Sequence, residues 1–303
     1  MKKIGADLVR PRQTRFKKYM VAYMFILPTL LYLLIFQLYP LLESVRLGFT
    51  NTSFLRPGSG KFIGLDNYKD LLFNTPEFGS IVKNSILWVL GSTFFQYLFA
   101  LPTSAVLNSN IAGRPLWRGL LMVPWVTPTV IMGVIFKAIF DGDYGIINYY
   151  LKTNIVWLGD GRTVWPVLLL TSVWKGLPYA TLMILAGLQG ISKDLYEAAY
   201  VDGCGKFKQF FKITLPLLTP VLFTSCLVSI VLTWTKFELI WVLTAGGPGT
   251  KTSILPTYVY TKSFINFDMG AGSAVATISM LFMLVFVLLY LRLFKKSDQY
   301  EVS

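Results

Sequence analysis

Six long apolar runs, separated by shorter polar segments, set the pattern of this sequence. The runs cover residues 20–42, 81–107, 117–140, 164–188, 217–243 and 272–294. A helix needs about 20 mainly apolar residues to cross a bilayer, and each run reaches that length. Backbone groups in lipid must find their hydrogen-bond partners within the chain, so single spanning runs of this kind form helices. The pattern predicts an all-α membrane protein with six transmembrane helices.

The segment before the first run is basic, which is also typical of a cleaved signal peptide. The run is too long for such a peptide, and no small-residue cleavage site follows it. We therefore expect a retained first helix and no separate soluble domain. The predicted organisation is a basic cytosolic tail at 1–19, a membrane domain at 20–294 with a polar loop at 189–216, and a cytosolic tail at 295–303.

Composition and charge agree with this organisation. Hydrophobic residues make up 54% of the chain and charged residues 14%, against roughly 25% charged in soluble domains. With the N-terminus inside, the cytosolic segments carry sixteen basic and six acidic side chains, and the outer segments carry eight of each. This asymmetry follows the positive-inside rule and places both termini in the cytosol. The net charge of +13 then faces anionic lipid head groups and does not indicate a nucleic-acid partner.

Cysteine and histidine usage excludes several kinds of site. The chain has no histidine, so a histidine-assisted nucleophile or a histidine-ligated metal cannot form within it. Cys204 falls in a predicted inner loop and Cys226 inside a predicted span, so we expect no disulfide between them and no metal site. A membrane-embedded enzyme would also need a convergent acid–base cluster, which the sequence lacks.

One glycine-rich segment resembles a phosphate-binding loop but does not match it. The Walker pattern requires glycine immediately before the lysine, and Thr250 precedes Lys251. The segment also lies between two predicted spans with no strand ahead of it, where a glycine and proline turn is expected. We therefore predict no nucleotide site or other cofactor in this chain, so an energy source would be supplied by another chain.

The polar loop at 189–216 has the features of a helix, a turn and a second helix. Ser192 can cap a short helix, and four residues follow at helical spacing on one narrow face. These four are Leu195, Ala198, Ala199 and Asp202. Gly203 and Gly205 permit a reversal of the backbone. We expect a second, basic and aromatic helix at 206–212, and Pro216 at the entry to the fifth span. An amphipathic helix lying on the membrane without a partner is the alternative.

The spacing from Glu197 to Pro216 is E-A-A-x3-G-x9-I-x-L-P. It resembles the signature loop of ABC-importer permeases. The resemblance implies that the first helix is the coupling helix, which inserts into a cleft of the ATP-binding subunit, with Glu197 as acidic anchor and Gly203 as turn. The implied coupling residues are Leu195, Glu197, Ala198, Ala199, Asp202 and Gly203. An exposed ion pair adds only about 0–1 kcal/mol, so packing of Leu195 and the two alanines should carry most of the affinity.

Further segments are similar to carbohydrate-uptake permeases of the maltose and glycerol-phosphate type. They are G-L-x-N-Y at 64–68, W-K-G-L-P-Y at 174–179, L-T-A-G-G-P at 243–248 and G-A-G-S-A at 270–274. The resemblance implies a sugar site formed by Lys175, Gly176, Tyr179, Ser229, Leu232, Thr233 and Lys236. Ser229, Thr233 and Lys236 are spaced i, i+4 and i+7, so we expect all three on one face of the fifth helix. Serine and threonine in membrane helices can instead bond to their own backbone.

The resemblance implies a type I ABC importer permease fold with six transmembrane helices. The chain would be a non-enzymatic subunit that carries a carbohydrate, expected to be an oligosaccharide. Implied partners are a second permease, two cytosolic ATP-binding subunits and an extracytoplasmic solute-binding protein. We expect a heterodimer of permeases, although self-pairing stays open.

Two alternatives remain from the sequence. The first is an ion-coupled secondary transporter that uses Glu238. The second concerns substrate charge, because Lys175 and Lys236 would repel each other unless an anionic group lies near. A sister permease, backbone carbonyls or an acidic substrate could each supply that group.

Overall fold

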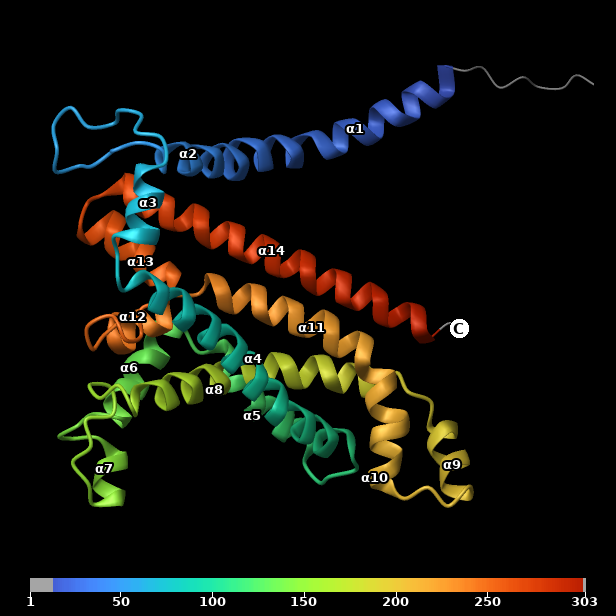
Figure 1. Cartoon of the computed structure of the whole chain (residues 1–303). Helices are drawn as coiled ribbons and strands as arrows, with labels where there is room; N and C mark the ends of the chain where they lie inside the picture. The colour runs from blue at the N-terminus through green and yellow to red at the C-terminus, as the bar shows by residue number, and fades with distance from the viewer. Residues whose placement is uncertain (1–12, 302–303) are drawn as a thin grey trace, which may run out of the picture.

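The computed structural model describes residues 13–301. Within these residues the regular elements are all helices, and β structure is limited to isolated bridges. Residues 1–12 of the tail predicted at 1–19, and residues 302–303 of the tail predicted at 295–303, lie outside the described residues. Figure 1 shows long helices packed in a tilted bundle, with α1 (Gln13–Leu33) extending away from the rest. The other helices are α2 (Tyr39–Leu47), α3 (Asp66–Phe73), α4 (Phe78–Asn108), α5 (Arg114–Val126), α6 (Thr129–Ile139), α7 (Ile146–Leu151), α8 (Val164–Gln189), α9 (Lys193–Val201), α10 (Lys206–Gln209), α11 (Leu215–Thr235), α12 (Glu238–Thr244), α13 (Leu255–Tyr260) and α14 (Met269–Glu301).

Five of these segments are long and apolar enough to cross a membrane, and a sixth span is formed if the bent pair α5 and α6 counts as one. The five are Tyr23–Leu47, Phe78–Asn108, Val164–Gln189, Lys206–Thr235 and Met269–Phe294. The prediction of an all-α membrane chain is confirmed. Most of the six spans differ from the predicted bounds by a few residues at their ends. The third and fifth differ in their course, and both differences shape the central cavity.

The third run was expected to be one helix and is instead broken, with an angle of 94° between α5 and α6. Thr127 between them has an extended backbone (φ −66°, ψ 125°). The residue before a proline is disfavoured in helical conformation, and Pro128 follows Thr127. Pro128 also lacks the N–H that would continue the ladder. The break therefore follows from the local sequence.

The fifth run was expected over 217–243 and differs at both ends. It begins at Lys206, because α10, a π-helical turn (Phe210–Thr214) and α11 form one continuous segment. The wider turn precedes Pro216, whose ring would clash with a carbonyl in a regular helix. The helix ends at Thr235, since Lys236 is extended (φ −85°, ψ 112°) and α12 starts at Glu238. In its last turn the Thr235 hydroxyl bonds to the Leu232 carbonyl, at 3.1 Å.

The core lies where α4, α8 and α11 cross, as Figure 1 shows for α4 and α8. Buried Trp88, Leu168 and Ile230 come from these three helices and pack in one cluster with Leu239 of α12. Lipid tails are as apolar as these side chains, so close packing rather than removal of apolar surface from water holds the three helices together at the crossing. By contrast, the described side chains of the first span from Tyr23 to Leu42 are exposed.

The two ends of the bundle differ in construction. At one end, Asn67 of the predicted G-L-x-N-Y element donates hydrogen bonds to the carbonyls of Gly48 (2.9 Å) and Thr50 (2.8 Å). The amide of Gly270 at the start of α14 bonds to the Thr52 carbonyl nearby, at 2.9 Å. These bonds tie the loop between α2 and α3 to the last helix. The turn between α9 and α10 lies at the opposite end, together with the C-terminal end of α14 (Figure 1).

Candidate functional site

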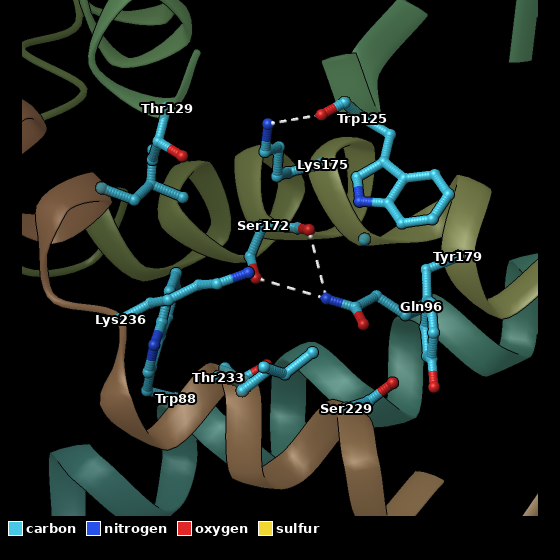
Figure 2. Close-up of a pocket in the computed structure, with 13 residues that line it drawn as sticks. Trp88, Gln96, Trp125, Thr129, Ser172, Lys175, Tyr179, Ser229, Thr233 and Lys236 are labelled. Atoms are coloured by element: carbon cyan, nitrogen blue, oxygen red, sulfur yellow. Dashed lines mark hydrogen bonds between the residues drawn. The ribbon is translucent and has the colours of Figure 1, made fainter. Parts of the chain in front are cut away.

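A cavity of about 170 Å³ lies at the crossing of α4, α8 and α11, next to the two broken spans. Its lining residues are Trp88, Gln96, Trp125, Thr129, Ser172, Lys175, Gly176, Tyr179, Ser229, Leu232, Thr233, Lys236 and Leu239. All seven residues predicted for the substrate site are among them. Figure 2 shows side chains from separate elements converging on this one space.

Lys175 forms hydrogen bonds with the backbone at the break in the third span. Its ammonium group donates hydrogen bonds to the carbonyls of Pro124 (3.2 Å), Trp125 (3.1 Å) and Thr127. In a continuous helix the Pro124 carbonyl would accept a bond from residue 128, but Pro128 has no N–H. The lysine supplies the missing donors and places a positive charge at the C-terminal end of α5, where the helix dipole favours it. Of the three partners that the sequence allowed for Lys175, the structure shows backbone carbonyls.

Gly176 allows α4 and α8 to approach closely. A Cβ atom at this position would overlap the Gln96 side-chain amide. Gln96 is buried, and its Nε2 donates to the Ser172 carbonyl, at 3.2 Å. The glycine therefore sets the position of an amide that borders the cavity, as Figure 2 shows.

The α11 wall carries the hydroxyl residues expected there, with one correction. Ser229 is buried and its hydroxyl lies 3.2 Å from the Tyr97 hydroxyl, so it bonds across to α4. Thr233 lies one turn further along α11 and also lines the cavity. Lys236 was expected on the same helical face, which is wrong, because the helix has ended at Thr235. Its side chain still reaches the cavity from the extended segment (Figure 2).

Aromatic rings and charge define the character of the cavity. Trp125 and Tyr179 meet edge to face, with ring centroids 6.2 Å apart, and Trp88 lines the wall formed by α4. The lining includes two lysines and no carboxylate. Glu238 is exposed in the first turn of α12 and does not line this cavity. The site therefore combines apolar ring faces, hydroxyl and amide groups, and positive charge.

The first helix predicted in the polar loop at 189–216 is present as α9. The Ser192 hydroxyl accepts a bond from the Asp194 amide (3.3 Å) and caps its start, as predicted. Gly203 has φ +72°, a left-handed conformation that glycine adopts at little cost. The Cys204 amide then bonds back to the Ala199 carbonyl, at 2.8 Å. These bonds end the helix in a tight reversal.

The exposed face of α9 differs from the predicted one in one residue. Leu195, Glu197, Ala198 and Asp202 are exposed, as expected for a docking face. Ala199 is instead buried within the chain itself, so it does not belong to that face. Tyr200 and Val201 are 78% and 85% exposed and extend the apolar surface around the turn. The loop is braced from within by the Tyr196 hydroxyl, which lies 2.9 Å from the Thr214 hydroxyl.

Comparison with known proteins places these features in a family. Residues 96–299, more than half of the chain, match the family described as binding-protein-dependent transport system inner membrane component. The chain belongs to this family. Members of this group are membrane components of transport systems, so the permease is a membrane-spanning transport subunit and not an enzyme.

Two curated relatives extend the match along nearly the whole permease. It is 31% identical to the trehalose/maltose transport system permease protein MalF of Thermococcus litoralis, over 92% of this chain and 95% of that protein. It is also 31% identical to the sulfoquinovosyl glycerol transport system permease protein SmoG of Agrobacterium fabrum, over 95% and 96%. Probable ABC transporter permeases from other bacteria match at similar identity, among them YurN of Bacillus subtilis.

A solved structure shows the same fold. A chain of a bacterial ABC transporter involved in the import of the acidic polysaccharide alginate superposes with a TM-score of 0.81, at 20% identity. The superposition covers 94% of the permease and 98% of that chain. The predicted type I importer permease fold is confirmed by this match.

Six cavity residues were not predicted from the sequence. They are Trp88, Gln96, Trp125, Thr129, Ser172 and Leu239. A signal existed for two of them. Gln96 is an amide within an apolar run, where polar residues are costly and usually functional, and Ser172 lies one helical turn before Gly176. Trp125, Thr129 and Leu239 flank the two breaks, which the apolar pattern did not reveal, and Trp88 lies in an unbroken apolar run where nothing distinguished it.

Proposed function

We propose that this permease carries an oligosaccharide through the membrane in an ATP-driven importer, and that the central cavity holds the sugar. The observation that carries the proposal is the lining itself. Sugar rings pack their C–H faces on aromatic rings, and their hydroxyls need hydrogen-bond partners. Trp125 and Tyr179 supply ring faces, and Gln96, Ser229 and Thr233 supply polar groups. The names of the trehalose/maltose and sulfoquinovosyl glycerol permeases support a carbohydrate.

The proposed assembly follows from family membership and from the exposed α9. The family is named for dependence on a binding protein, which supports an extracytoplasmic solute-binding protein as donor of the sugar. We infer that α9 docks into a cytosolic ATP-binding subunit, one of two that use ATP and Mg²⁺. A second permease completes the pathway, and we propose that it is a different but related chain, so that the two form a heterodimer. The exposed apolar side chains of the first span are available for lipid and for that second permease.

The test uses the complete importer in vesicles with ATP inside and a labelled oligosaccharide pool outside. We expect uptake that requires ATP hydrolysis and continues when an uncoupler collapses the proton gradient. Uptake that stops on uncoupling, with ATP held constant, would instead favour an ion-coupled transporter that uses Glu238.

A matched pair of tyrosine variants tests the cavity. Tyr179→Ala removes an aromatic ring that lines the cavity. Tyr149→Ala removes a ring of α7 that is 78% exposed and does not line the cavity. A lost ring contact is worth about 1–3 kcal/mol, so uptake at low sugar concentration should fall by about 5- to 150-fold in the first variant only. Equal uptake by the two variants would show that the sugar does not use this cavity.

A further inference from the structure

We propose that the two cavity lysines have separate roles: Lys175 holds the broken span, and Lys236 recognises an anionic group on the sugar. The group would be a carboxylate, sulfonate or phosphate. This inference rests on the proposed function, because it names the charge class of the sugar in the same cavity. It also makes Lys236 a residue that determines specificity.

The bonds of Lys175 leave it no donor for a substrate. A lysine ammonium group has three N–H donors. The three carbonyls of Pro124, Trp125 and Thr127 accept all of them. Figure 2 shows the Lys175 nitrogen directed toward the Trp125 carbonyl and away from the middle of the cavity. Its charge is therefore engaged by the end of α5.

Lys236 differs in each of these respects. Its side chain extends from the end of α11 into the cavity, as Figure 2 shows. Within residues 13–301, the ion pairs join Arg46 to Glu43 and Lys69 to Asp66, so neither involves Lys236. No hydrogen bond of its ammonium group is found in this described part of the chain. Glu238, two residues away, forms no ion pair with it.

The rest of the lining does not balance this charge. No aspartate or glutamate borders the cavity. The buried Trp88 indole nitrogen is a second donor without a partner in the described residues. Charge-assisted bonds to carboxylate or phosphate are about twice as strong as neutral ones. A site that holds an unpaired cation and spare donors discriminates against a sugar that offers only hydroxyls, because its own groups then stay unpaired.

The first experiment measures the charge in the cavity without knowledge of the substrate. Cys204 and Cys226 are replaced by alanine in the full importer, and Thr233→Cys provides a single thiol in the cavity. Its reaction rate is compared for two thiosulfonate reagents, one carrying a sulfonate and one a quaternary ammonium group. A free lysine nearby should favour the negative reagent, and Lys236→Gln should lower the ratio of rates by about tenfold or more.

The matched control for this experiment is Lys83→Gln, which removes an exposed lysine of α4 that does not line the cavity. The control should leave the ratio unchanged, and Lys236→Arg should preserve it. If Lys236→Gln does not change the ratio, the cavity holds no free positive charge from this residue and the inference is wrong.

The second experiment identifies the anionic group. Vesicles with the full importer receive a pool of oligogalacturonides, a sulfonated sugar, hexose phosphates, maltodextrins and xylo-oligosaccharides, and imported components are identified by mass spectrometry. We expect an imported component with an anionic group, whose uptake falls at least about tenfold in Lys236→Gln and is retained in Lys236→Arg. Import of neutral sugars alone would overturn the inference while leaving the proposed function intact. Absence of any ATP-dependent import would contradict the proposed function itself.

Discussion

The bonds between Lys175 and the end of α5 lead to a quantitative prediction. In Lys175→Met the side chain keeps its length and loses its three donors. Each bond contributes about 1 kcal/mol net, so the loss should be about 3 kcal/mol. The partial exposure of Lys175 weakens the Coulomb part of these bonds, so we do not expect a larger loss. For a chain of 303 residues, about 3 kcal/mol corresponds to a lower unfolding midpoint by about 5 °C.

Two measurements check this prediction in the purified importer. The first is thermal unfolding, with Lys137→Met as the matched control, because Lys137 is an exposed lysine of the adjacent α6. The second is the distance between spin labels placed at the exposed positions Leu120 of α5 and Ile135 of α6, which reports the 94° bend. We expect a broadened distance distribution in Lys175→Met only. An unchanged midpoint and distribution in that variant would refute the argument that this lysine holds the break.

Three other predictions concern the loop at 189–216, the cavity wall and the loop between α6 and α7. Glu197→Lys and Gly203→Val should each abolish transport, although the subunit still inserts into the membrane. Valine is strained at the φ of +72° that Gly203 adopts. In both variants less of the ATP-binding subunit should co-purify. Gly176→Ala should lower uptake because its Cβ overlaps the Gln96 amide, with normal uptake contradicting the proposed close contact. The backbone amides of Tyr144 and Asp143 donate hydrogen bonds to the Asp141 carboxylate and lower its pKa. The contribution of this carboxylate to stability should therefore be present near neutral pH and be lost as pH falls through the lowered pKa. Acid unfolding curves should show this loss in the natural chain and not in Asp141→Asn.

The apolar runs predicted the architecture because the physics of a membrane leaves few alternatives. A run that must satisfy its backbone in lipid becomes a helix, so the number and order of the spans could be read from residues 20–294. The same reasoning could not locate the break after Thr235, where no proline or glycine interrupts the run. The break at Thr127 had a local signal in Pro128, but apolarity on both sides concealed it.

The site was predictable where it depended on recurrent residues and not where it depended on the path of the backbone. Resemblance led to Lys175, Gly176 and Tyr179 because they stand in a fixed segment of α8. The actual role of Lys175 was not predictable in this way, because its partners are carbonyls of another helix and any sequence could supply them. Ala199 was assigned to the wrong side of α9, since helical spacing alone does not show which side the chain itself covers.

The segment from Lys206 to Thr235 connects the α9 turn to the cavity wall, where Ser229 and Thr233 lie, and Figure 1 shows it bent between α10 and α11. At 1.5 Å per residue, Leu215 and Ser229 are about 21 Å apart along α11, so a tilt of α11 by about 10° at its first residue would move Ser229 by about 4 Å. That displacement exceeds the length of a hydrogen bond. A small rotation of α11 is therefore enough to separate its wall from a sugar that α4 and α8 still hold.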